Sequence, residues 1–381
     1  MSPPDSPSQL PDLLVQRWRS VRPVLLLAAT ATAEQPGISA AGATPASRRF
    51  TAAADAELLL LGPDAARPHA LPPLPAGVSP ALIAHAGLQE LGLLPRTLVV
   101  DLGCPVAPGV PHLRLPRQEA AGPAACVSTG RAMARERVAA LLERGRRWGR
   151  CWPSAEPLLL AECVPGGTTT ALAVLEGLGI AAAGLVSGSL RQPAHRLKAR
   201  LVGQGLEAAG LGTAAEPLAV LAAVGDPMQV LAAGLLLELA PRGVPVLLAG
   251  GSQMAAVLAV ALACATPARR QALAASALVA TTAWLAEEPG SDLARLLQLI
   301  GDRWGVEPQL QAAGLRFKSC RSAALRDYER GYVKEGVGAG GVAVLWELAG
   351  RDPRALAMVC DRHCELFQPS RGLSIHVDER V

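Results

Sequence analysis

Short, continuous runs of apolar residues alternate along this chain with longer segments of helical length, and glycines stand at many of the junctions. Apolar strands joined by helical crossovers are typical of a parallel sheet that helices cover on both faces. The pattern therefore predicts an α/β fold with a doubly wound, mainly parallel sheet. The runs predicted to be strands are 23–29, 56–62, 97–103, 157–163, 179–187, 218–225, 244–251 and 277–285, with the clearest helices at 129–148 and 193–209.

The two ends of the chain depart from this pattern. Residues 1–20 open with an acidic, proline-rich segment that is neither a signal nor a transit peptide, and we expect a flexible tail. Residues 351–381 are predicted to form a helical extension that ends in a polar, strand-like tail. The expected architecture is a Rossmann-like main domain at residues 21–350 with a smaller, mostly helical part from the chain ends.

Composition and charge narrow the class of protein. Hydrophobic residues make up 50% of the 381 residues and aromatic residues only 3%, so the core must be aliphatic. A net charge of +4 is mild for this length, and nucleic-acid binding would need basic stripes with aromatic residues among them. The strongest basic run surrounds Trp148, and we interpret it as the solvated end of a helix: Arg144, Arg146, Arg147 and Arg150. No nucleic-acid partner is expected.

The eight cysteines form no CxxC pair and no zinc-ribbon spacing, so reduced cysteines in the cytoplasm are the simplest interpretation. Their only local cluster is Cys360, His363 and Cys364, and we expect neither a metal nor a cofactor there. The longest apolar stretch, 244–265, reaches membrane-spanning length but holds Gly250–Gln253 in its middle. A buried strand, a turn and a buried helix fit that stretch better than a membrane helix, although a membrane component stays as an alternative.

In doubly wound folds, ligands bind beyond the carboxyl ends of the strands, at helix N-termini. The residues that follow the predicted strands are unusually polar or rich in glycine here. In the sequence AECVPGGTTTAL, Gly166 and Gly167 would let backbone N–H groups approach an anion, and Thr168–Thr170 would cap the next helix. A plain structural turn explains this loop equally well. The other loops of this kind are Ser187, Gly188 and Ser189; Gly225 and Asp226; and Gly250, Gly251 and Gln253.

Two further features add charge to this edge of the predicted sheet. Lys198 lies in the helix that follows the 187–189 loop, where it could contact a phosphate or simply face solvent. Glu335 precedes Gly336 and Gly338 in VKEGVGAGGVAVLWEL, so a carboxylate stands again at a backbone that a ligand can approach. A glycine-rich helix entrance with an exposed glutamate is the competing interpretation. Two such loops suggest a site with an anion cradle and a proton acceptor.

Together these segments resemble the nicotinate-nucleotide:dimethylbenzimidazole phosphoribosyltransferase family, and more closely its divergent cyanobacterial and archaeal branch. The family's Glu-Met-Gly-Ile-Gly-Asn-Thr-Thr loop matches Glu162–Thr169, and its Leu-Gly-Glu-Gly-Thr-Gly-Ala loop matches Val333–Ala339. A family lysine aligns with Lys198, and Glu288 begins a matching Glu-Pro-Gly segment. The resemblance covers about residues 157–350, whereas residues 36–45 and 72–88 resemble the divergent branch alone, so base-binding residues cannot be transferred.

The resemblance implies a cytoplasmic homodimer that transfers 5-phosphoribose from nicotinate mononucleotide to a benzimidazole or purine base, which activates the lower ligand of cobamides. It implies Glu335 as general base and Glu162 as the residue that orients the sugar or stabilises charge. Two departures, Gly250 for a family aspartate and Gly167 for a family asparagine, leave a non-catalytic nucleotide- or cobamide-precursor-binding protein as the alternative. The residues implied to bind substrate are Gly166, Gly167, Thr168, Thr169, Ser187, Gly188, Ser189, Lys198, Gly225, Asp226, Gly250, Gly251, Gln253, Gly336 and Gly338.

Overall fold

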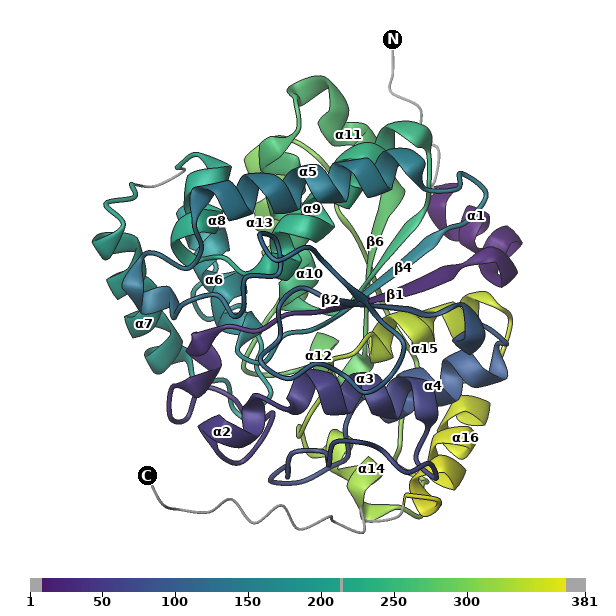
Figure 1. The fold of residues 1–381 in the computed structure, drawn as a ribbon. Helices are drawn as coiled ribbons and strands as arrows, with labels where there is room; N and C mark the ends of the chain where they lie inside the picture. Colours follow the sequence, from purple (N-terminus) through teal and green to yellow (C-terminus); the bar gives the residue numbers. More distant parts are fainter. Residues whose placement is uncertain (1–8, 213–214, 368–381) are drawn as a thin grey trace.

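The computed structural model describes residues 9–212 and 215–367, and a seven-stranded sheet forms its centre (Figure 1). The strand order is β3-β2-β1-β4-β5-β6-β7, and every neighbouring pair is parallel. This confirms the predicted doubly wound, parallel α/β fold. The strands are β1 Arg22–Leu27, β2 Leu98–Asp101, β3 Leu113–Arg114, β4 Leu158–Cys163, β5 Val246–Ala249, β6 Ala277–Thr281 and β7 Gln309–Ala312.

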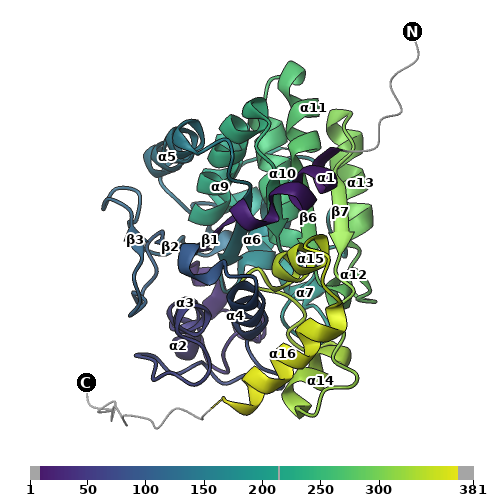
Figure 2. The same cartoon turned by 90° about the vertical axis from the view of Figure 1, so that its right-hand side faces the viewer.

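Helices cover both faces of the sheet because successive strand residues point to opposite sides. In β4, Leu158 and Leu160 enter one hydrophobic core, and Leu159 and Ala161 enter the other. The first core lies under α5 Arg135–Cys151, α6 Gly167–Gly177, α7 His195–Ala208, α8 Pro217–Val224, α9 Pro227–Leu239, α10 Ser252–Cys264, α11 Pro267–Ser276 and α13 Leu293–Trp304. The second lies under α1 Gln9–Arg17, α3 Thr51–Leu61, α4 Ala81–Glu90, α15 Ala339–Leu348 and α16 Pro353–Glu365 (Figures 1 and 2). Short helices α2 Pro45–Arg48, α12 Ala283–Ala286 and α14 Ala323–Glu329 complete the chain.

Five of the eight runs predicted to be strands are strands in the structure. Runs 23–29, 97–103, 157–163 and 244–251 coincide with β1, β2, β4 and β5 to within a few residues, and run 277–285 covers β6 and most of α12. The strand predictions at 56–62 and 218–225 are wrong, because these residues lie in α3 and α8, and residues 179–187 form no strand. Both helices are mostly buried and carry no polar stripe, so their apolar runs look like those of a buried strand.

Helices from the two chain ends meet on the second face of the sheet, as Figure 2 shows. The prediction of a flexible tail is wrong for residues 9–20, since α1 buries Leu10 and Leu14 in the core and contacts α15. Helix α16 forms the expected C-terminal helix and packs on α4. Residues 1–8 and the predicted strand-like tail at 368–381 lie outside the described residues.

The long apolar stretch 244–265 contains β5, a turn at Gly250 and Gly251, and α10, as predicted. Between residues 9 and 367, as far as the structure describes them, no helix combines the length and apolarity that crossing a membrane requires.

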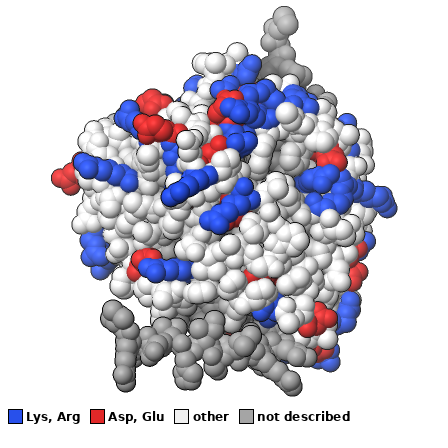
Figure 3. All heavy atoms as spheres, in the orientation of Figure 1, with Lys and Arg blue, Asp and Glu red and all other residues white. Residues whose placement is uncertain are grey.

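The arginine-rich end of α5 is paired with carboxylates. Arg144 pairs with Glu119, and Arg146 with Glu238, each at 2.8–2.9 Å. The side chain of Arg147 is 63% exposed and lies beside Glu143. Figure 3 shows basic and acidic side chains intermixed on this face, which agrees with a solvated helix surface.

Helices α5 and α9 touch through glycines. A Cβ atom on Gly145 would overlap the Leu231 carbonyl oxygen and lie 3.0 Å from the Gly234 Cα atom. A Cβ atom on Gly234 would likewise overlap the Leu142 carbonyl oxygen. Backbone atoms cannot rotate away as a side chain can, so this helix pair tolerates no added methyl group.

We therefore expect Gly145→Ala to lower the free energy of unfolding by about 1–3 kcal/mol through overpacking. The matched control is Gly203→Ala in α7, where an added Cβ meets nothing within 4 Å. That change should raise stability by about 0.5–1 kcal/mol, because alanine favours the helix more than glycine. Urea unfolding followed by circular dichroism measures both, and equal shifts in the two variants would contradict the packing argument.

Candidate active site

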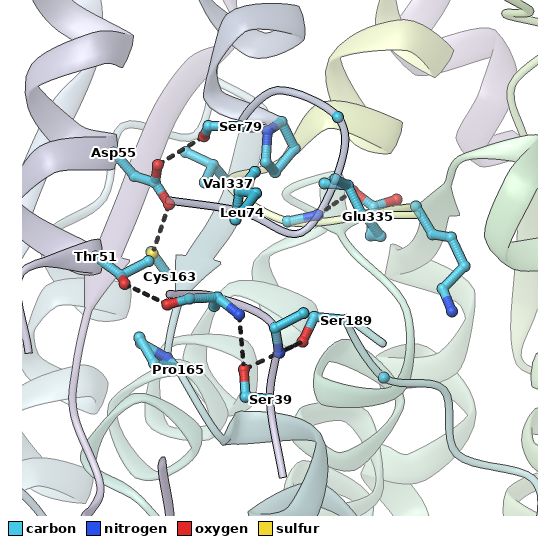
Figure 4. Close-up of a pocket in the computed structure, with 18 of the residues that line it drawn as sticks. Ser39, Thr51, Asp55, Leu74, Ser79, Cys163, Pro165, Ser189, Glu335 and Val337 are labelled. Atoms are coloured by element: carbon cyan, nitrogen blue, oxygen red, sulfur yellow. Dashed lines mark hydrogen bonds between the residues drawn. The ribbon is translucent and has the colours of Figure 1, made fainter. Parts of the chain in front are cut away.

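A cavity of about 330 Å³ opens at the carboxyl edge of the sheet, beyond β1, β4 and β5. The chain leaves β1 toward β2 and leaves β4 toward β5, so the strand order reverses between β1 and β4. Ligands of open α/β sheets bind at such a reversal. The cavity wall comes from residues 39–41 after β1, 162–168 at the end of β4, 251–253 after β5, and 332–337 before α15 (Figure 4).

One end of the cavity is formed by the start of α6. Gly166 has φ 80° and lies against η2 (Ala31–Glu34), where a Cβ atom would come within 2.9 Å of the Ala33 nitrogen. Gly167 begins the helix, and a Cβ atom there would overlap the Gln253 side chain. These glycines are thus required by packing as well as by the turn. With Thr168 they line the cavity, and the positive end of the helix dipole suits an anion.

Lys198 joins the two loops predicted to hold an anion. Its Nζ atom donates to Thr168 Oγ1 at 2.9 Å and to the Ser187 carbonyl oxygen. The side chain is fully buried, and burial lowers the pKa of Lys198 to about 7, although Glu288 opposes this shift. Ser189 continues the connection, since its Oγ accepts the Ala40 N–H at 2.8 Å.

Glu335 is held by four donors. Its Oε2 atom accepts from Thr281 Oγ1 and the Thr282 N–H, both at 2.9 Å. Its Oε1 atom accepts from the Gly336 and Gly340 N–H groups, both at 3.0 Å. A carboxylate offers about four lone-pair positions, so these bonds occupy the acceptor capacity of Glu335. Burial raises its pKa, and the four hydrogen bonds act against that rise.

Glu162 is the last residue but one of β4 and also lines the cavity. Among the contacts of the described residues, its carboxyl takes a hydrogen bond from the Val164 N–H alone. Burial, followed by the nearby carboxyls of Asp226, Glu335 and Asp55, raises the pKa of Glu162 to about 8. Glu162 therefore changes protonation near neutral pH and keeps acceptor positions open toward the cavity.

A buried ion pair that the sequence interpretation overlooked connects these parts. Lys334 Nζ donates to Glu288 Oε1 at 2.5 Å and to the Leu190 carbonyl oxygen at 2.7 Å. Glu288 also accepts the Ser187 hydroxyl at 2.5 Å. The Lys334 backbone has φ 66°, and Val333 beside it has φ 64°, conformations that cost energy for residues with a Cβ atom. The strained loop of Glu335 is thus tied to the Ser187 loop.

Several predicted substrate-binding residues lie behind the cavity wall. Asp226 is fully buried, caps α9, and accepts hydrogen bonds from Thr170 Oγ1 and Gln253 Nε2 at 2.5 and 3.0 Å. It therefore supports α6 and α10 from behind and lies outside the cavity wall in this structure. Gly225, Gly250, Thr169, Gly338 and the fully buried Lys198 also lie outside the wall, whereas Gly166, Gly167, Thr168, Ser187, Gly188, Ser189, Gly251, Gln253 and Gly336 line the cavity.

The other end of the cavity was not recognised from the sequence. Its wall is the proline-rich segment 71–80 together with Thr51 and Asp55 of α3. The density of prolines in PPLPAGVSP was a usable signal, because such a segment forms a stiff, apolar wall. Asp55 gave no signal, since the strand predicted beside it is a helix.

The cysteine and histidine cluster near the C-terminus does not assemble with other ligands. His363 stacks on His85 with ring centroids 5.3 Å apart, and Cys364 Sγ lies 3.0 Å from Ser322 Oγ. In the described part of the chain, no three histidine, cysteine, aspartate or glutamate side chains gather as metal ligands.

Comparisons with known proteins identify the family of this chain. The sequence profile of a family described as phosphoribosyltransferase (DBI_PRT) matches residues 95–287. A UPF0284 protein of Parasynechococcus marenigrum is 55% identical over 344 residues, which cover 89% of this chain and 85% of that protein. A UPF0284 protein of Gloeobacter violaceus is 47% identical and covers 91% of this chain and 89% of its own length.

Solved structures show a similar fold. The crystal structure of nicotinate-nucleotide-dimethylbenzimidazole phosphoribosyltransferase from Thermus thermophilus matches with a TM-score of 0.55 and 20% sequence identity. The match covers 97% of this chain and 95% of that protein. The structure of CobT from the same organism gives a TM-score of 0.54.

The lowered pKa of Lys198 leads to a pH-dependent anion affinity. The lysine is charged below a pKa of about 7 and neutral above it, so its attraction for a phosphate dianion weakens as pH rises. We expect the affinity for ribose 5-phosphate to fall between pH 7.5 and 9.5, where the phosphate itself no longer titrates. Isothermal titration calorimetry should show weaker, nearly pH-independent binding for Lys198→Met.

The control is Lys318→Met, which removes an exposed lysine outside the cavity wall. It should retain the pH dependence of the unchanged protein. The same pH dependence in Lys198→Met would show that Lys198 does not govern anion binding.

Proposed function

The chain belongs to the phosphoribosyltransferase family, and its relatives include UPF0284 proteins. From this family membership we propose the following reaction. It transfers 5-phosphoribose from nicotinate mononucleotide to a ring nitrogen of a benzimidazole or purine base and releases nicotinate. This reaction would activate the base as the lower ligand of a cobamide. It would make the protein a pentosyltransferase among the glycosyltransferases.

The observation that carries this proposal is the pairing of an anion cradle with two unlike carboxyls in one cavity. The start of α6 and the Ser187 loop line the end suited to the 5-phosphate, and Lys198 joins them from behind the wall. Glu162 and Glu335 reach the same cavity from β4 and from the loop before α15. Held at the phosphate, the ribose would present its C1′ atom to the carboxyls, so binding energy away from the reacting atoms would fix their orientation.

The bond changes require little from the protein. The bond between C1′ and the pyridinium nitrogen breaks, and its electron pair neutralises that nitrogen, so nicotinate leaves without a proton. The azole nitrogen of the base forms the new bond to C1′, which carries positive charge at the transition state. A nearby carboxylate stabilises that charge. The other ring nitrogen of the attacking azole then loses its proton to a general base.

The hydrogen bonds favour a division of roles that differs from the one expected from the sequence. Glu335 was expected to act as the base, but a ligand N–H can reach its oxygens only if one of four donors withdraws. Glu162 has open acceptor positions and a pKa of about 8, close to a working pH. We assign proton acceptance to Glu162 and stabilisation of the cationic transition state to Glu335.

The remaining expectations concern the setting of the reaction. We propose that the protein acts as a cytoplasmic homodimer on small-molecule substrates and uses no cofactor. All eight cysteines are unpaired thiols, which is consistent with a reducing compartment.

The assignment of the base can be tested with Glu162→Gln in a nicotinate-release assay. The change should lower kcat/KM by about 10²-fold or more with 5,6-dimethylbenzimidazole, because general base catalysis is lost. In the unchanged protein the rate should rise with pH through about 8, where Glu162 loses its proton, and the variant should lack that rise.

A base without a proton to lose supplies the control. With 1-methylbenzimidazole, Glu162→Gln should cause only a small loss, whereas Glu335→Gln should slow both bases equally. The opposite pattern would return the general base to Glu335. Binding of nicotinate mononucleotide without nicotinate release from any base would favour a non-catalytic binding protein instead.

A further inference from the structure

The end of the cavity away from Lys198 is an apolar slot. It is lined by residues 71–78, with Pro72, Pro73 and Pro75 among them, and by Val333 and Val337. Proline walls are stiff and present flat apolar surface. A slot of this kind suits a planar aromatic ring, which in the proposed reaction is the attacking base.

One acidic group interrupts this apolar surface. Asp55 lies on α3 and is 6% exposed, and Figure 4 shows it across the cavity from Glu335, with Leu74 and Val337 drawn between them. Its Oδ1 atom accepts the Ser79 hydroxyl at 2.6 Å, and its Oδ2 atom accepts the Cys163 thiol at 3.5 Å. A thiol is a weak donor, so Oδ2 in particular keeps acceptor capacity.

A neighbouring residue on the same helix shows what a purely structural carboxylate looks like in this protein. Glu57 is fully buried, lies outside the cavity wall, and accepts hydrogen bonds from the His69 and Gly109 N–H groups at 2.8 Å and contacts His69 Nδ1 at 2.6 Å. Both of its oxygens are thus held by close partners within the protein. Asp55, in contrast, lines the cavity and has only two hydrogen-bond donors, the Ser79 hydroxyl and the Cys163 thiol. Both groups donate to Asp55, so its carboxylate acts as the acceptor.

The position of Asp55 also lowers the stability of the fold. The residue lies among the alanines of α3, where aspartate is less favourable to the helix than alanine, and burial raises the pKa of Asp55 to about 6. Above that pH it is a buried carboxylate, and such a group is stabilised by an additional hydrogen-bond donor. A ligand in the slot could therefore supply the hydrogen-bond donor that the Asp55 carboxylate lacks.

We propose that Asp55 selects the attacking base by accepting a hydrogen bond from an N–H donor on the ring, remote from the nitrogen that attacks C1′. This inference rests on the proposed function and specifies its substrate class as azole bases that carry an amino group. A base with a methyl group at the same place would leave the Asp55 carboxylate buried without its partner, which costs binding free energy.

Isosteric base pairs test this directly. The assay measures nicotinate release from nicotinate mononucleotide with 4- and 5-aminobenzimidazole and with the corresponding methylbenzimidazoles. The unchanged protein should prefer at least one amino base over its methyl isostere by about tenfold or more in kcat/KM. This ratio does not depend on the folding of any variant, and equal values for both pairs would overturn the proposal.

The variant Asp55→Asn keeps the shape of the side chain and changes its hydrogen bonding. The Ser79 hydroxyl would hold the amide oxygen and leave the NH₂ group toward the slot, where it repels an amino donor. The amino-to-methyl ratio should fall to about one, and 5-methoxybenzimidazole, which only accepts hydrogen bonds, should gain relative to the amino base. Retained activity with the methyl base shows that the variant is folded, and an unchanged ratio contradicts the role of Asp55.

Thr51→Val is the matched control, because Thr51 also lines this end of the cavity and donates to the Ala41 carbonyl oxygen. It should change the rates of amino and methyl bases by the same factor. Two failures can be told apart. If no base yields nicotinate, the proposed function is wrong. If nicotinate is released from all bases without discrimination, the reaction stands and Asp55 does not select the base.

Discussion

The close contact between the first turn of α15 and the sheet determines where the catalytic loop can lie. A Cβ atom on Gly341 would overlap the Ala249 side chain of β5, and one on Gly338 would lie 2.7 Å from the Ala161 Cβ atom of β4. A Cβ atom on Gly340 would overlap Glu335 and the end of β6. Only glycine facing alanine brings the helix this near, and this approach lets the Gly340 N–H and the Thr282 N–H bind one carboxylate. The sheet, the helix and Glu335 therefore form one rigid unit.

Buried charges and strained backbone angles lie around that unit. They lower the stability of the protein, and the rest of the fold must offset this loss. Glu162, Asp55, Asp226 and Glu335 are close enough that the first feels the other three, and its pKa rises accordingly. Two buried lysines lie near the same cavity, and Lys334 is paired with Glu288 at 2.5 Å. Breaking a buried pair of this kind leaves a charge without a partner, which destabilises more than the pair itself stabilises. Positive φ angles at Val333 and Val337 add to the cost in the same loop, and strain concentrated at one site is typical of function.

The sequence was sufficient to predict the structure wherever residues close together in the chain determine it. Short apolar runs located β1, β2, β4 and β5, and the loop at Gly166 was correctly placed at a helix start beside a cavity. It was insufficient wherever burial is complete, because α3 and α8 show no polar stripe by which a helix could be told from a strand. Contacts between distant segments were equally hidden. The Lys334–Glu288 pair joins residues 46 positions apart, and Asp226 was assigned to the cavity although it caps a helix behind it.

The two ends of the cavity come from different parts of the chain. Binding of the phosphoribosyl group and choice of the base can therefore change independently. The segment 95–287 that matches the phosphoribosyltransferase profile contains Glu162 and the anion end, which the start of α6 and the Ser187 loop line and Lys198 supports from behind. The apolar slot is built from residues 51–55 and 71–80, outside that segment. Substitutions in the slot can alter which ring is accommodated while the hydrogen bonds of Lys198 and Thr168 stay in place. A fold arranged in this way can keep its handling of the phosphoribosyl group and change the base that receives it.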